Sequence, residues 1–293
     1  RIAEAVTYGG QLSIRWIEKA LNEYLNEILK TENEDYVIAS DTDSVYITFE
    51  KLMDKLNPKD PVKFLDTICR EKIEPFIDGK YAELAEYVNA YEQKMVMARE
   101  VIADKGIWTA KKRYILNVHN SEGVQYAEPK LKMMGIEAVK SSTPQVCRDK
   151  IKDALKVIMS GDENDLNDFI QDFRKEWMGM DAASIAFPRS CNGMKKWRDS
   201  NSVYLKGTPM HVKGALIYNH QLKVKKLSSK YPEIMDGEKI KFVHLKDPNP
   251  YQCNAFTFLT DCPKELDIYK YIDYEKQFEK SYVEPLKFIT SAI

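Results

Sequence analysis

The sequence predicts an α+β fold in which a small antiparallel sheet with packed helices is followed by a mostly helical part. Apolar residues recur at helical spacing across residues 11–29, which indicates an amphipathic helix. In residues 36–49, β-branched and aromatic residues flank a short polar centre, a pattern typical of a hairpin. After Gly135 the pattern becomes mostly helical. We therefore expect two domains, residues 1–135 and residues 136–293.

The elements of the first expected domain follow in order. The helix at 11–29 precedes a hairpin whose turn is Asp41-Thr42-Asp43-Ser44. Helical residues fill about 61–92, with a break expected near Pro75 and Gly79. Two extended segments surround residues 120–123, which have the composition of a hairpin loop. Together these elements predict a sheet with helices against it.

The second expected domain opens on a helix start. Ser141-Ser142-Thr143-Pro144 places hydroxyl caps ahead of a proline at the first helical position, and Gly161 supplies a stop. A second helix is expected at about 164–177. A strand is expected at Lys239–Leu245.

Composition excludes several classes of protein. The 293 residues include 44% apolar residues, which excludes a mainly disordered chain. No run approaches the ~20 consecutive apolar residues of a membrane-spanning helix, so no membrane partner is expected. The five cysteines are odd in number and lack the spacing of zinc or redox motifs, which predicts reduced thiols in a cytosolic compartment. Because Arg1 replaces an initiator methionine, we expect a piece of a longer protein.

The charge is balanced overall and divided locally. There are 44 Lys plus Arg against 45 Asp plus Glu. Acidic side chains outnumber basic ones in residues 1–94, whereas basic ones outnumber acidic ones in residues 103–148 and 189–246. This distribution suits a protein that holds cations in one place and a polyanion in another, although a charged run is more often a solvated face.

The acidic turn is the first candidate site. Alternate residues of an extended chain point to one side, so the sequence places the carboxylates of Asp41 and Asp43 together. Like charges so close oppose ionisation unless a cation lies between them, and hard oxygen ligands favour Mg²⁺. Such a pair can hold the metal ions of phosphoryl transfer. The alternative is a structural turn in which each Asp bonds its own backbone.

A basic stretch forms the second candidate. Lys111-Lys112-Arg113-Tyr114 is predicted to begin a strand, with Lys112 and Tyr114 on one side and Lys111 and Arg113 on the other. Burying a charge is costly, so these cations are expected to face solvent or a ligand. Cations beside an aromatic hydroxyl can hold a phosphate backbone. The alternative is an ordinary solvated strand.

These motifs resemble a known family. Asp41-Thr42-Asp43-Ser44-Val45-Tyr46 is similar to the third conserved catalytic motif of family B DNA polymerases, in which the second Asp ligates both metals and the first lies beside them. Lys111–Tyr114 resembles the Lys-Lys-x-Tyr motif that holds the primer strand in that family. Residues 135–144 are similar to the junction into the thumb, and residues 278–286 to the end of the thumb in T-even-like phages.

The resemblance implies a set of roles. Residues 1–135 would be the distal half of the palm domain, and residues 136–293 the thumb. Asp43 and Asp41 would be the catalytic, metal-binding residues for two Mg²⁺ ions. Thr42, Ser44 and Glu100 would hold the metal-binding carboxylates in place. The primer or duplex would contact Lys111, Lys112, Arg113, Tyr114, Lys140, Ser141, Ser142 and Thr143. Further basic residues of the thumb would be Arg148, Lys150 and Lys213.

The implied partners are primer-template DNA, deoxynucleoside triphosphates and the N-terminal remainder of the polymerase. A sliding clamp would bind only through an apolar tail that this sequence lacks. The expected location is the cytoplasm of a phage-infected bacterium. The family's third carboxylate, from an Asp followed shortly by Ser-Leu-Tyr-Pro-Ser, and its fingers helix are also missing. The sequence is therefore expected to need a further polypeptide region for catalysis.

Two other functions are compatible with parts of the sequence. A haloacid-dehalogenase-type phosphotransferase also carries an Asp-x-Asp after a hydrophobic strand, but it needs a parallel, doubly wound sheet, and the extended residues after Asp43 argue against it. A non-catalytic duplex-DNA-binding subunit of a split polymerase would keep the basic stretches and use the acidic turn only structurally.

Overall fold

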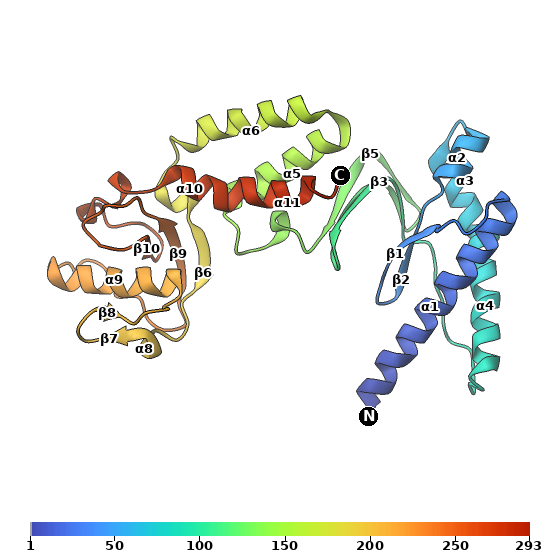
Figure 1. The fold of residues 1–293 in the computed structure, drawn as a ribbon, viewed down its shortest axis with the longest axis horizontal. Coiled ribbons are helices and arrows are strands. Elements are labelled where there is room, and N and C mark those ends of the chain that lie inside the picture. Colours follow the sequence, from blue (N-terminus) through green and yellow to red (C-terminus); the bar gives the residue numbers. More distant parts are fainter. Residues whose placement is uncertain (1) are drawn as a thin grey trace. The chain divides into compact units, whose positions relative to one another are not determined.

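A computed structural model describes residues 2–293 of the chain (Figure 1). The fold is mixed, with helices and small sheets, which is compatible with the predicted α+β class. The chain divides into two compact units. The first runs up to Gly106 and includes Ile115–Lys132, and the second comprises Ile107–Tyr114 and Met133–Ile293. The assignment of residues 1–135 and 136–293 to palm and thumb stays a prediction.

The first unit contains a long helix, a hairpin and a bundle of shorter helices. The hairpin is the predicted one, and its strands pair antiparallel. The elements are α1 (Ile2–Leu29), β1 (Val37–Asp41), β2 (Ser44–Ile47), α2 (Glu50–Leu56), α3 (Pro61–Ile68) and α4 (Glu74–Tyr87).

Two details of the predicted helices are wrong. Helix α1 begins at Ile2 and not near residue 11, and its first turns are exposed. No break occurs at Gly79, because α4 continues through it. Pro75 lies in the first turn of α4, where a proline has no N–H to lose. A π-helical turn at Cys69–Ile73 joins α3 to α4.

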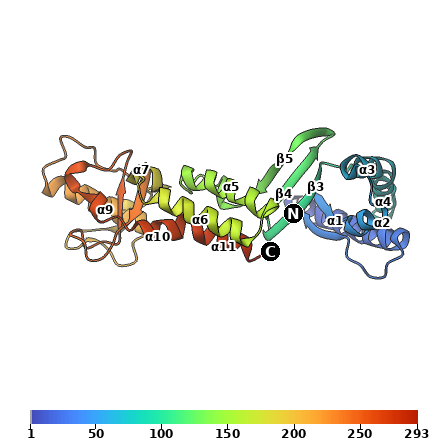
Figure 2. The ribbon, with the colours of Figure 1, turned by 90° about the horizontal axis from the view of Figure 1, so that it is seen from above.

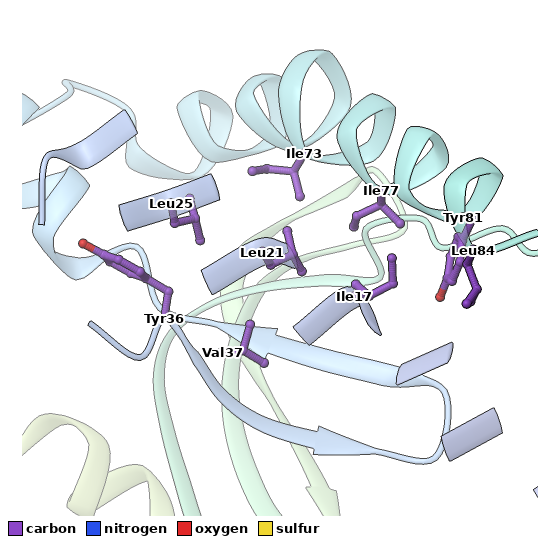
Figure 3. Close-up of a cluster of buried hydrophobic side chains, with 9 residues drawn as sticks. All are labelled: Ile17, Leu21, Leu25, Tyr36, Val37, Ile73, Ile77, Tyr81 and Leu84. Atoms are coloured by element: carbon purple, nitrogen blue, oxygen red, sulfur yellow. The ribbon is translucent and has the colours of Figure 1, made fainter. Parts of the chain in front are cut away.

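One apolar core holds this unit together. Side chains from α1, from the hairpin, and from the π-helical turn and α4 meet between these elements, as Figure 3 shows. Removing such side chains from water contributes roughly 1.5–3 kcal/mol for each large residue. The core therefore seats the hairpin on α1. Its buried members are Ile17, Leu21, Leu25, Tyr36, Val37, Ile73, Ile77, Tyr81 and Leu84.

Two asparagines of α1 fix the entry to β1. The Oδ1 atom of Asn22 accepts the backbone N–H groups of Tyr36 at 2.8 Å and Val37 at 2.9 Å, and its Nδ2 donates to Asp35 at 2.9 Å. Asn26 donates to the carbonyl of Glu34 at 2.8 Å and accepts its N–H at 3.0 Å. These bonds set where the hairpin starts along α1.

Three further strands, β3 (Val101–Ala110), β4 (Arg113–Ser121) and β5 (Val124–Met134), form a sheet in the order β3-β4-β5. The predicted loop near 120–123 joins β4 to β5. Strand β3 was not predicted. Two-residue turns at Lys111-Lys112 and Glu122-Gly123 connect the strands, and connections this short join antiparallel neighbours.

The second unit pairs helices with a small sheet. Helices α5 (Gln145–Ser160) and α6 (Glu163–Trp177) pack with the C-terminal helical segment of α10 (Tyr274–Phe278), the π-helical turn Glu279–Val283 and α11 (Glu284–Thr290), as Figure 2 shows. The other elements are α7 (Ala182–Ile185), β6 (Phe187–Ser190), α8 (Met194–Trp197), β7 (Arg198–Asp199), β8 (Val203–Tyr204), α9 (Met210–Val224), β9 (Lys239–His244) and β10 (Ala255–Phe258).

The predicted helix at 164–177 and the predicted strand near 239–245 are confirmed by α6 and β9. The expectation of a mostly helical region is incomplete, because β9 lies between β10 and β6 in an antiparallel sheet. The predicted start of α5 is also shifted. Pro144 is the residue before the helix, and no hydroxyl side chain caps it.

The sheet topology excludes one alternative. The pairs β1–β2, β9–β10, β6–β9 and β7–β8 are antiparallel, and the turns of β3-β4-β5 require the same. Residues 2–293 thus contain no parallel, doubly wound sheet, which a haloacid-dehalogenase-type enzyme requires. Across the same residues, no helix combines the length and the apolar character that crossing a bilayer demands.

We expect Asn22→Ala to destabilise the first unit by about 1–3 kcal/mol, because two buried backbone donors lose their acceptor. Equilibrium denaturation of the chain measures this change. Glu27→Ala is the matched control on an exposed position of the same helix, with an expected change within about 0.5 kcal/mol. Equal effects of the two substitutions would contradict the role of Asn22.

Candidate functional site

The acidic turn lies at the tip of the β1–β2 hairpin. Asp41 ends β1 and pairs with Ser44, the first residue of β2, so Thr42 and Asp43 form a two-residue turn. The N–H of Asp43 donates to the carbonyl of Asp41 at 2.6 Å. The hydroxyl of Ser44 donates to the same carbonyl at 3.1 Å, and that of Thr42 to the Asp41 carboxylate at 3.0 Å.

Strand alternation, which we predicted to bring the two carboxylates to one side, does not apply to this pair. Asp43 is a turn residue and not a strand residue, and Thr42 has a φ of 54°. This left-handed conformation favours glycine or asparagine, and a β-branched residue there is a true outlier. Strained backbone of this kind, held by its surroundings, is common at functional sites. The turn, and not the pleat, therefore sets the positions of Asp41 and Asp43.

Asp43 is the more accessible carboxylate. It is exposed, and within residues 2–293 its side chain has no hydrogen-bond or ion-pair partner. In the same part of the chain, no group of three or more His, Cys, Asp or Glu side chains is arranged to hold a metal ion. Asp41 and Asp43 offer the hard oxygen donors that Mg²⁺ prefers, and they fit a part of a magnesium site.

The segment around Arg99 has a role that the sequence did not indicate. The Arg99 side chain is only 12% exposed, pairs with Asp66 of α3, and donates to Asn120 of β4 at 2.7 Å. Its backbone N–H donates to Glu74 of α4 at 2.8 Å. Arg99 therefore ties both helices to the sheet.

Glu100 pairs with a lysine of the same sheet. Its carboxylate forms an ion pair with Lys132 of β5. The carbonyl of Glu100 accepts the N–H of Glu122 at 2.7 Å, which anchors the turn between β4 and β5. The predicted support of the metal site by Glu100, and the similar roles of Thr42 and Ser44, stay predictions.

The basic stretch is a turn followed by a strand. Lys111 and Lys112 are exposed in the connection between β3 and β4, and Lys112 has a φ of 60°. The predicted alternation of all four side chains on one strand is therefore wrong for these two lysines. Tyr114 is 5% exposed, and its ring centroid lies 6.5 Å from that of Trp108. The lysines are presented to solvent while the tyrosine ring is packed.

Gly135 lies directly against this turn. A Cβ atom at Gly135 would overlap the carbonyl oxygen of Lys112 and lie 3.1 Å from Cγ of Arg113. Its φ of +67° is also one that other residues rarely adopt. The absence of a side chain at Gly135 thus allows the backbone of the Lys111-Lys112 turn to approach the segment before α5.

Arg113 and Lys140 share one carboxylate. Arg113 donates to Oε2 of Glu137 at 2.6 Å, and Lys140 donates to Oε1 of the same residue at 2.9 Å. The guanidinium carbon of Arg113 lies 4.5 Å from the ring centroid of Phe288 in α11. The predicted direct contact of Arg113 with DNA is untested, but its guanidinium is already held inside the unit.

The residues before α5 form a turn with a fixed backbone. The carbonyl of Ser142 accepts a hydrogen bond from Arg189 of β6 at 2.7 Å, and burial lowers the pKa of Arg189. Thr143 is buried, and its N–H donates to the carbonyl of Lys140 at 3.1 Å. Ser141 is exposed. Of the predicted duplex contacts in this turn, Ser141 therefore presents the most accessible hydroxyl.

The other basic residues predicted for the second unit have internal partners. Lys150 pairs with Glu176 at 2.8 Å and lies 5.0 Å from the ring centroid of Phe173. Lys213 lies 5.2 Å from the ring of Tyr204. Arg148 bonds Gln145, and its Nε is buried. Their roles in binding a polyanion stay predictions.

Sequence reasoning missed four positioning residues, namely Asn22, Arg99, Glu137 and Arg189. Asn22 and Asn26 stand one helical turn apart beside the apolar stripe of α1, and that spacing was an available signal. The partner of Arg99 is 33 residues away, and that of Arg189 is 47 residues away. No local pattern indicates contacts of that kind.

Comparison with known proteins gives two close matches along the chain. The chain is 36% identical to the "DNA-directed DNA polymerase" of Enterobacteria phage T4, over 98% of its own length and 33% of that protein. It is 39% identical to the protein of the same name from Escherichia phage RB69, over 100% of its own length and 34% of that protein. No family model matches the chain. The chain thus spans about one third of the length of these curated relatives.

We expect Gly135→Ala to displace the Lys111-Lys112 turn and to destabilise the second unit more than the same change at Gly237, which lies in the same unit. Both glycines have a positive φ, which costs alanine about 1–2 kcal/mol, but only Gly135 has backbone against it. The overlap should add about 1–3 kcal/mol. Thermal unfolding of both variants measures the difference. Equal losses of stability would show that close approach at Gly135 is unimportant.

Proposed function

We propose a function from the premise that the chain is homologous, over its whole length, to one third of the family B DNA polymerases of T-even phages. The chain supplies the distal half of the palm, within residues 1–135, and the thumb, residues 136–293, of a DNA-directed DNA polymerase. The observation that carries this proposal is the exposed Asp43 at the tip of a core-anchored hairpin, within a chain homologous to polymerases along its whole length.

The rest of the enzyme must come from another polypeptide region. The relatives are about three times as long as the stretch that this chain matches. Asp41 and Asp43 provide only part of a metal site, so a further carboxylate is needed. We use the term assembled polymerase for this chain together with the polypeptide that supplies the remaining two thirds of the family's sequence.

The proposed reaction is attack of a primer 3′-hydroxyl on the α-phosphate of a deoxynucleoside triphosphate. Asp43 would hold both Mg²⁺ ions and Asp41 would lie beside them. When bound, two such ions lower the pKa of the attacking hydroxyl and stabilise the departing pyrophosphate. This chain would contribute a hairpin whose base packs into a buried core. At its tip, Asp43 is exposed, and Asp41 is restrained by a hydrogen bond from Thr42.

The second unit would hold the primer-template duplex. The exposed ammonium groups of Lys111 and Lys112 suit a phosphate backbone, and Tyr114 would stabilise the adjacent strand β4 by packing. Lys140 and the exposed hydroxyl of Ser141 extend the polar surface beside the junction. Backbone contacts of this kind carry no sequence information, which suits a polymerase that must copy any template.

Asp43→Asn should lower the rate of primer extension by the assembled polymerase at least about 100-fold, because a neutral amide cannot replace a carboxylate that holds metal ions. Binding of primer-template DNA should change little. Asp54→Asn makes the same change in charge at an exposed site of α2 and should keep the normal rate. A normal rate for Asp43→Asn would favour the non-catalytic DNA-binding subunit.

Lys112→Asn should weaken binding of primer-template DNA on every sequence and reduce the slope of log K against log salt by about one, if one phosphate contact is lost. Asparagine tolerates the left-handed backbone of this position. Lys30→Asn is the matched control, since Lys30 is also exposed with a φ of 57° but lies in the acidic region. Identical slopes for both variants and the unmodified protein would remove Lys112 from the DNA surface.

A further inference from the structure

Glu137 is a carboxylate placed among cations. Its two oxygens are occupied by Arg113 at 2.6 Å and Lys140 at 2.9 Å, and its side chain is only 20% exposed. Lys111 and Lys112 precede Arg113 directly in the chain. If this surface only attracted a polyanion, a negative charge here would weaken it. The position of Glu137 therefore needs a geometric reason.

The contacts of Arg113 supply that reason. Its side chain is 24% exposed, one terminal nitrogen is bonded to Glu137, and its face covers the ring of Phe288. Its Nε atom is buried without a hydrogen-bond partner among the described residues, so the base of the guanidinium points inward. A guanidinium held by a carboxylate on its edge and an aromatic ring on its face has little freedom to turn toward a phosphate.

These contacts join three separate segments. Arg113 follows the Lys111-Lys112 turn, Glu137 precedes α5, and Phe288 lies in α11. Gly135 brings the backbone of the turn against the same segment as Glu137. The turn is thus fixed by one ion pair, one cation–π contact and one close backbone approach.

We propose that Glu137 is a positioning residue for the primer, which holds Arg113 and Lys140 so that the Lys111-Lys112 turn and the Lys140-Ser141 turn face the DNA backbone in one fixed arrangement. Arg113 then acts as part of this support and does not bind phosphate itself. The inference rests on the proposed function, because it assigns the turn to primer binding. It assigns to Glu137, Arg113 and Phe288 a role that motif similarity alone does not indicate.

The experiment uses Glu137→Gln and Arg113→Gln, singly and together, in the assembled polymerase. Positioning predicts that each single variant lowers kcat/KM for primer extension by about 10- to 100-fold, since a 1 Å misplacement of a bound substrate can cost about 100-fold. The double variant should lose less than the product of the two single effects, because both substitutions break the same Arg113–Glu137 ion pair. The slope of log K against log salt should stay unchanged for Arg113→Gln, since no phosphate contact is lost.

Two further variants keep the test independent of folding. Phe288→Leu retains apolar volume and removes the aromatic face, so it should lower extension in the same direction. Arg113→Lys keeps the charge opposite Glu137 and should recover part of the activity lost in Arg113→Gln. Glu233→Gln, which removes a carboxylate paired with Lys223 at 3.2 Å in the same unit, should leave extension unchanged.

Three results would overturn the inference. Glu137→Gln could bind DNA more tightly and extend primers at the normal rate, which would show that the charge of Glu137 only repels the DNA phosphates. Arg113→Gln could reduce the salt slope by about one while Glu137→Gln has no effect, which would make Arg113 a direct phosphate ligand. All variants could lose thermal stability in proportion to activity, which would make the contacts merely structural. If Lys112→Asn and Asp43→Asn are also without effect, the proposed function fails and not only the positioning role.

Discussion

The packing of the β1–β2 hairpin against α1 is the contact on which the candidate catalytic turn depends. A two-stranded hairpin alone is marginally stable in water. Here Val37 and Tyr36 enter the core formed by α1 and α4, and Asn22 accepts the two backbone N–H groups at the start of the strand. Apolar burial supplies the stability, and the hydrogen bonds supply the register. A tip with strained backbone at Thr42 can persist because its base is fixed in both ways.

The second unit contains two kinds of cation, those paired within the protein and those exposed to solvent. Most of its predicted DNA-contacting cations are bonded to protein groups, including Arg113 and Lys140 to Glu137 and Lys150 to Glu176. Arg113 lies at a partly buried pair, while Lys111 and Lys112 stay exposed in the turn before it. A rigid guanidinium that is paired can place the neighbouring exposed ammonium groups. In the proposed function, the paired guanidinium supports the turn and the exposed lysines contact DNA.

The sequence predicted the parts of the fold whose signal is local. The hairpin at 36–49, the helix at 164–177 and the strand near 239–245 each depend on a periodic pattern inside one segment. Strand β3 and the helical residues at the start of α1 lack such a pattern, because β3 buries only Ile102 and those helical residues meet no core. The two lysines of the basic turn were placed on a strand because alternation cannot detect a turn without glycine, asparagine or proline.

The candidate site shows the same limit more sharply. The types and order of the residues identified Asp41, Asp43 and the basic stretch as candidate site residues, because the charge of a carboxylate or an ammonium group follows directly from the residue type. The roles of Arg99, Glu137 and Arg189 depend instead on distant partners. Their contacts with Asp66, Arg113 and Ser142 span 33, 24 and 47 residues, respectively. A charged residue that is paired and largely buried binds its own protein, whereas the same residue left exposed is available to a ligand. Arg113 and Lys112 are both residue types that can contact DNA. Only Lys112 is exposed, whereas the side chain of Arg113 is largely buried.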